Sequence, residues 1–194
     1  MESVPTAQQE VVGLCTDLIR FDTSNFGPDG SKGEREAAEY VAARLDDVGI
    51  AAELFESEPR RTSVVAHWEP EGCDRSLPPL LIHGHTDVVP AMADDWPVDP
   101  FAGEVRDGYV WGRGAVDMKD FDAIILSVVR QRQRSGRAPR RPIRLVFTAD
   151  EEAGGRKGSG WLARTHPELV ADCSEAIGEV GGFSLSVNDK RLYL

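Results

Sequence analysis

The chain has 194 residues, 41% of them hydrophobic and 28% charged, a balance that is typical of a globular protein and excludes an intrinsically disordered one. Its formal net charge of −11 excludes nucleic acid as the expected partner, because the phosphates of nucleic acids bind cationic surfaces. The longest apolar runs are too short to cross a lipid bilayer, which excludes a membrane-spanning segment and a membrane partner.

Helical periodicity comes first along the chain. Apolar residues recur every three or four positions in residues 11–19 and 37–48, which predicts two amphipathic helices, the second ending at Gly49. Residues 22–33, between these helices, are rich in Gly, Ser, Asn and Pro and predict a loop. Short apolar runs then predict three strands, at residues 51–55, 62–68 and 80–82.

The second half of the chain continues the alternation of helices and strands. The patterns predict a helix from about residue 121, a buried strand at 143–148, a short helix at 160–165 and two strands at 183–187 and 191–194. Asn188-Asp189 is expected to form the turn between the last two strands. The predicted fold class is therefore α/β, with a mixed, mostly parallel sheet sandwiched by helices and incomplete at the C-terminus.

The cysteine pattern bears on the cellular compartment. Cys15, Cys73 and Cys173 are odd in number, far apart and without a CxxC pair, which predicts neither a disulfide framework nor a thiolate zinc site. Residues 1–10 also lack the basic and apolar segments of a secretory signal peptide. We therefore expect a cytoplasmic protein.

In the stretch 81–90, a histidine and an aspartate stand two positions apart where an apolar run ends. Residues at this spacing share one face of a strand, so Asp87 can orient the ring of His85 and fix its tautomer as a metal ligand. A strand-end ion pair at the surface is the simpler interpretation. Acidic residues that follow along the chain favour the metal site: Asp117, Glu151, Glu152 and Glu179.

Glu151 and Glu152 follow the predicted strand at 143–148. Neighbouring residues on a strand point to opposite faces, so both can reach one site only after the strand has ended, and the Ala-Gly-Gly sequence at 153–155 provides that ending. One glutamate can then bind metal while the other acts as general base. Asp150 competes for either role, and sequence position alone does not decide among the three; a solvated acidic surface is the simplest alternative.

Asp117 follows a glycine-bearing turn and precedes the third predicted helix, so its two carboxylate oxygens can lie between two cations. Capping of that helix is the alternative, because aspartate is a common N-cap residue. Glu179 follows a short apolar strand and lies beside glycines, which alone is weak evidence for a ligand.

Four segments, in this order, resemble the co-catalytic dizinc aminoacylase and peptidase family: 84–90 (GHTDVVP), 96–101 (WPVDPF), 112–119 (GRGAVDMK) and 150–154 (DEEAG). The family includes acetylornithine deacetylase, succinyl-diaminopimelate desuccinylase, aminoacylase and glutamate carboxypeptidase. The resemblance implies a zinc exopeptidase-like fold and metal-dependent hydrolysis of an amide bond in a peptide or N-acyl amino acid.

The resemblance also implies a set of metal ligands. His85 would bind one zinc ion, Asp117 would bridge two, and Glu152 would bind the other. Glu179 matches the position of the remaining carboxylate ligand. Because nitrogen and oxygen ligands suit several divalent ions, Co²⁺ or Mn²⁺ could take the place of Zn²⁺.

Two catalytic residues are implied in the same way. Glu151 would be the general base, and Asp87 would be the partner that orients His85. The peptide bond that follows the bridging aspartate is often cis in this family, so we expect a cis bond between Asp117 and Met118.

Members of this family are much longer than the present chain. The resemblance therefore implies that residues 1–194 are the N-terminal portion of the zinc hydrolase catalytic domain. The lid or dimerisation domain, through which full-length relatives can form homodimers, and the C-terminal catalytic segment with the last zinc-binding histidine would be absent. The competing interpretations are a truncated, catalytically silent metal-binding fragment and an α/β binding module without metal.

Overall fold

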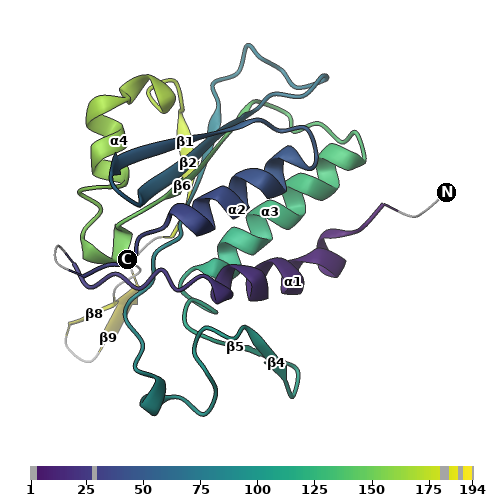
Figure 1. The fold of residues 1–194 in the computed structure, drawn as a ribbon. Helices are drawn as coiled ribbons and strands as arrows, with labels where there is room; N and C mark the ends of the chain where they lie inside the picture. The colour runs from purple at the N-terminus through teal and green to yellow at the C-terminus, as the bar shows by residue number, and fades with distance from the viewer. Residues whose placement is uncertain (1–3, 28–29, 180–183, 188–189, 194) are drawn as a thin grey trace.

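The structure, a computed structural model, describes residues 4–27, 30–179, 184–187 and 190–193. A five-stranded sheet lies between two helical layers (Figure 1). Helices α1 (Ala7–Arg20), α2 (Arg35–Asp46) and α3 (Lys119–Arg134) cover one face, and the short helix α4 (Ser159–Thr165) covers the other. The predicted α/β class with helices on both faces is confirmed.

The sheet is mixed. Its strands are, in spatial order, β1 (Ala52–Glu58), β2 (Arg61–Trp68), β6 (Ile143–Thr148), β3 (Leu80–His85) and β7 (Glu175–Ile177). The pairs β1–β2 and β2–β6 are antiparallel, whereas β3 is parallel to both β6 and β7. In the β3–β6 register His85 is opposite Thr148, so these two strands end side by side and the loops that follow them start from one edge of the sheet.

Other elements lie outside this sheet. They are the hairpin of β4 (Glu104–Arg106) and β5 (Tyr109–Trp111), the strand pair β8 (Ser184–Val187) and β9 (Lys190–Tyr193), and the 3-10 turns η1 (Ala93–Asp95), η2 (Glu151–Ala153) and η3 (Pro167–Leu169). The β8–β9 pair matches the two strands expected at the end of the chain, whereas the predicted turn at Asn188-Asp189 lies outside the described residues. The periodicity did not predict the β4–β5 hairpin.

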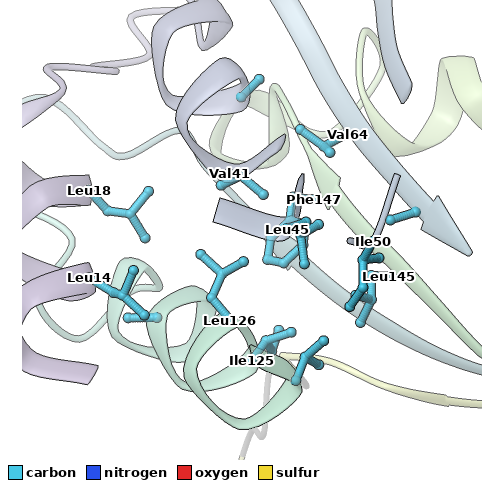
Figure 2. Close-up of a cluster of buried hydrophobic side chains, with 14 of the residues drawn as sticks. Leu14, Leu18, Val41, Leu45, Ile50, Val64, Ile125, Leu126, Leu145 and Phe147 are labelled. Carbon is cyan, nitrogen blue, oxygen red and sulfur yellow. The ribbon is translucent and has the colours of Figure 1, made fainter. Parts of the chain in front are cut away.

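Strand alternation explains how two cores form on one sheet. Val64 and Phe147 face α1, α2 and α3 and belong to the main core, while their neighbours Val65 and Val146 face the other side and pack against Leu162 of α4. Figure 2 shows the main core between the helical layer and the sheet. Its largest side chains include Leu18, Leu45, Leu126, Leu145 and Phe147.

Local signals set the ends of the first two helices. Thr6 caps α1 in a capping box, since its hydroxyl accepts a hydrogen bond from the N–H of Gln9 and the Gln9 side chain accepts one from the N–H of Thr6. Beyond α2, Gly49 has φ of 77° and donates its N–H to the carbonyl of Asp46, which confirms the predicted stop. Within the described part of the chain, no helix is both long and apolar enough to cross a bilayer.

Gly158, just before α4, lies against the main chain that follows β6. A Cβ atom at this position would lie 1.7 Å from the carbonyl oxygen of Ala149. Because a main-chain atom cannot move aside as a side chain can, Gly158→Ala is expected to lower the free energy of unfolding by roughly 3 kcal/mol or more. Urea denaturation measures this loss.

Gly13, in the middle of α1, provides a matched control. A Cβ atom there would meet no heavy atom within 4 Å, and the backbone is helical. Gly13→Ala is therefore expected to raise the free energy of unfolding by about 0.5–1 kcal/mol, because alanine has the higher helix propensity. Equal stability of Gly158→Ala and the wild type would contradict the described packing of Gly158 against Ala149.

Candidate metal centre

His85 is the last residue of β3, and its side chain is only 1% exposed. Its Nδ1 atom lies 3.0 Å from the main-chain carbonyl oxygen of Asp87 and 3.5 Å from the carboxylate oxygen Oδ1 of the same residue. A carbonyl oxygen can only accept, so Nδ1 carries a hydrogen, and once the ring is neutral the lone pair lies on Nε2. This is the tautomer that a metal ligand requires, and Asp87 sets it mainly through its main chain.

Three carboxylates surround the Nε2 atom of His85. It lies 3.2 Å from Oδ1 of Asp117, 3.2 Å from Oε2 of Glu179 and 3.8 Å from Oε2 of Glu151. The ligand atoms of His85, Asp117 and Glu179 all lie within 4.8 Å of one another, which is close enough for one ion to bind all three. These residues, with Glu151, line an open pocket at the edge of the sheet where β3 and β6 end.

Asp117 enters this pocket from the segment before α3. Its peptide bond to Met118 is cis, as predicted. Met118 is the N-cap residue of α3, while the 56% exposed carboxylate of Asp117 faces His85. Asp117 is therefore not the N-cap residue of α3, and helix capping does not explain an aspartate at this position.

The glutamate pair leaves the sheet through a tight turn. Strand β6 ends at Thr148, Asp150 has the left-handed φ of 65°, and Glu151 and Glu152 form the first part of the 3-10 turn η2. Both glutamates thus come after the strand, as expected. The carboxylate of Glu151 lies in the pocket, whereas Oε1 of Glu152 accepts a hydrogen bond of 3.2 Å from the main-chain N–H of Val89.

Asp150, the third acidic residue of this run, takes a different place. It is 3% exposed, and Oδ2 of its carboxylate accepts the main-chain N–H of Lys157 at 2.9 Å. Its other oxygen accepts the side-chain amide of Asn25 at 3.3 Å. The structure therefore directs Asp150 into the protein and Glu151 into the pocket, a distinction that sequence position could not make.

Asp87 has a second role that the sequence did not indicate. Its buried carboxylate accepts the main-chain N–H of Glu151 at 3.0 Å through Oδ1 and that of Glu152 at 3.1 Å through Oδ2. Burial alone raises the pKa of Asp87, but the close His85 ring and the Asn25 amide outweigh it and hold this pKa below its usual range. Asp87 therefore links the end of β3 to the turn that carries both glutamates.

His83 shares a strand face with His85 and borders the same pocket. Its Nε2 atom lies 3.0 Å from the hydroxyl oxygen of Thr148, and burial lowers its pKa. This histidine therefore makes a structural hydrogen bond.

The chemistry of the pocket fits a divalent cation. Burial raises the pKa of Glu151, and the negative charges of Asp87 and Glu179 raise it further. For Glu152, burial and then the charge of Asp117 raise the pKa to about 6. Carboxylates that repel one another in this way are stabilised by a bound cation, and one imidazole nitrogen with several carboxylate oxygens is a suitable donor set.

Binding of a cation to His85 is expected to release about one proton between about pH 7 and 8.5. Burial lowers the pKa of His85, but the hydrogen bond and charge of Asp87 outweigh it and raise this pKa to about 10. Because the ion needs the neutral ring, its apparent association constant should rise about tenfold per pH unit over this range. Isothermal titration in buffers of different ionisation enthalpy counts the protons, and an affinity independent of pH would contradict the prediction.

Comparisons with known proteins agree on one family. The profile of "Peptidase family M20/M25/M40" matches residues 81–188. Aminoacylase-1 of Sus scrofa is 36% identical over 161 residues, which cover 82% of this chain and 38% of the relative. Cysteinylglycine-S-conjugate dipeptidase of Corynebacterium striatum is 30% identical over 173 residues, which cover 89% of this chain and 37% of the relative.

Solved structures share the fold. Human carnosine dipeptidase 1 has a TM-score of 0.74 at 18% identity, and the M20 family metallo-carboxypeptidase Sso-CP2 of Sulfolobus solfataricus has 0.73 at 20%. Each match covers 89% of this chain and 38% of the other. The chain thus spans less than half of the length of the curated relatives that it matches, 40% for aminoacylase-1 of Mus musculus. Because the family profile matches more than half of the chain and includes the pocket residues, this chain belongs to peptidase family M20/M25/M40.

Proposed function

We propose that this protein is the metal-binding part of a zinc-dependent amidohydrolase or exopeptidase, which hydrolyses an amide bond in a peptide or N-acyl amino acid. The observation that carries this proposal is the convergence of Asp117, Glu151 and Glu179 on the Nε2 atom of His85. A divalent ion in such a site polarises an amide carbonyl and lowers the pKa of water.

The ligand roles follow from the contacts in the pocket. His85, Asp117 and Glu179 would hold one ion, because their ligand atoms are already grouped. Asp117 would also face a second ion together with Glu152, whose pKa is raised by burial and then by the charge of the nearby Asp117. Zn²⁺ is the ion we favour, and Co²⁺ and Mn²⁺ are compatible with the same nitrogen and oxygen ligands.

Glu151 would act as the general base. Its side chain is 45% exposed and lies in the pocket without belonging to the grouped ligand set. It can therefore take a proton from the attacking water and deliver it to the nitrogen of the leaving amine. The raised pKa of Glu151 brings the carboxylate closer to the value at which it can both accept and return a proton. Asp87 would keep Glu151 and His85 in place through the contacts described above.

The names of the relatives support the substrate class, since they include an aminoacylase and a dipeptidase. We propose that residues 1–194 are the N-terminal portion of the catalytic domain, and that homodimer formation depends on a lid or dimerisation domain. All three cysteines are free thiols, which supports a cytoplasmic location.

Metal analysis and an amide-hydrolysis assay on this chain test the proposal. The metal-free protein would be loaded with Zn²⁺, dialysed and assayed on a panel of N-acetyl amino acids and dipeptides, with a chelator-treated sample as control. Bound zinc with chelator-sensitive hydrolysis is the expected result. Bound zinc without hydrolysis would favour the catalytically silent fragment, and no bound zinc would overturn the metal assignment.

A further inference from the structure

Asn25 lies beneath the glutamate turn, in the loop between α1 and α2, and is 5% exposed. Its side-chain amide donates to Oδ2 of Asp87 at 2.7 Å, the shortest hydrogen bond that the Asp87 carboxylate accepts. The same amide group also donates to Asp150 at 3.3 Å. Asn25 therefore bonds two buried carboxylates, that of Asp150 just before the turn and that of Asp87, from which 62 positions separate it.

The other end of the Asn25 side chain is held as firmly. Its carbonyl oxygen accepts hydrogen bonds from Nη2 of Arg61 at 2.9 Å, from the hydroxyl of Ser31 at 2.7 Å and from the main-chain N–H of Gly27 at 3.0 Å. With three donors at the oxygen and two acceptors at the nitrogen, the amide has one orientation that satisfies all its partners. The NH₂ group must then face Asp87.

Arg61, which donates to the Asn25 oxygen, is itself held by a buried ion pair. Arg61 is 4% exposed, and its Nη1 atom donates to Oε1 of Glu34, which is fully buried. Glu34 lies at the start of α2 and Arg61 begins β2, so the contacts connect the helical layer to the sheet. A buried polar network whose members are mutually bonded holds its groups in a defined geometry.

The main chain also holds Asn25 in register with the site. The N–H of Asn25 donates to the carbonyl of Val88 at 2.8 Å, and the N–H of Val88 donates to the carbonyl of Thr23 at 3.2 Å. The Thr23 hydroxyl donates to the carbonyl of Thr86 at 2.6 Å. Residues 23–25 thus run beside residues 86–88 and place the Asn25 amide opposite the Asp87 carboxylate.

We propose that Asn25 is a positioning residue for the candidate centre. Its amide orients the Asp87 carboxylate, which in turn holds the main-chain N–H groups of Glu151 and Glu152 and so places the Glu151 carboxylate beside His85. The value of this placement for catalysis rests on the proposed function. The placement itself can be measured without metal or substrate.

Hydrogen exchange of the Glu151 and Glu152 main-chain amides, followed by NMR on the ¹⁵N-labelled 194-residue chain, tests the proposal. Asn25→Asp keeps an acceptor for Arg61, Ser31 and Gly27 but replaces the donor with an oxygen that faces Asp87. Exchange of the two glutamate amides is expected to become about tenfold faster or more, while the amides of the β2–β6 ladder keep their wild-type rates. Asn25→Ala, which removes the donor without adding charge, should give the same pattern.

Ser31→Ala is the matched control, because it removes one partner of the Asn25 oxygen and leaves the donor side intact. It should leave the Glu151 and Glu152 amides at wild-type rates. The proposal is overturned if these two amides exchange at wild-type rates in the folded Asn25 variants, or if exchange accelerates equally throughout the sheet. A chain with the expected exchange pattern but no bound metal or turnover would contradict only the proposed function.

Discussion

Glu151→Gln is expected to lower the rate constant of amide hydrolysis by about 10²–10⁴-fold while the bound-metal content stays at the wild-type level. The glutamine keeps the size of the side chain but cannot accept the proton of water. Because Glu151 lies outside the group formed by His85, Asp117 and Glu179, its loss removes no ligand from that set. Steady-state kinetics and elemental analysis on the same preparation measure both quantities.

Two further variants make the interpretation specific. Glu152→Gln should lose metal as well as turnover, because Glu152 is the proposed ligand of the second ion. Glu71→Gln, at an exposed position in the turn after β2, should change neither. Full turnover in Glu151→Gln would contradict the role of Glu151, and loss of metal from it would instead make Glu151 a ligand.

His85→Ala is expected to weaken zinc binding by more than about 100-fold, since the loss of a residue that merely supports a ligand already weakens metal sites about 10–100-fold. His85 contributes the single nitrogen of the grouped ligand set, and both carboxylates of that set contact its Nε2 atom. Competition with a chromophoric chelator gives the dissociation constant, and circular dichroism checks that the variant is folded.

His83→Ala is the control for this prediction. It makes the same substitution on the same strand, two positions away, where the ring bonds Thr148. Zinc affinity should stay within about threefold of wild type, because His83 is not a proposed ligand. Equal loss of affinity in both variants would show that His85 acts only through the packing of β3.

The sequence alone predicted most of the secondary structure, because periodicity and capping depend on near neighbours. The predicted strand at 143–148 has the bounds of β6, and the helices expected at 11–19 and 37–48 lie within or largely overlap α1 and α2. The β4–β5 hairpin was missed because its three-residue strands are too short for a periodic signal. Asp107-Gly108, where both residues have positive φ, was the available turn signal.

The lineage was also readable from the sequence, since four ordered segments resembled the family to which the chain belongs. The ligand residues can be recognised in the sequence because a metal site requires particular donor atoms, whatever the length of the segments between the ligands. The sequence left open which of Asp150, Glu151 and Glu152 reaches the pocket. The left-handed backbone at Asp150 decided that, because the Asp150 carboxylate points inward and the Glu151 carboxylate that follows points toward His85.

Residue types and their spacing therefore determined the α/β elements, the family and the candidate ligands. Only the tertiary structure decided that the Asp87 carboxylate holds the Glu151–Glu152 turn and that Asn25 bonds Asp87 from 62 positions away. Contacts of this kind depend on how the loop at 23–25 aligns with residues 86–88 and on where β3 and β6 end together. No local pattern encodes that alignment, because it arises from the packing of segments that are distant in the chain.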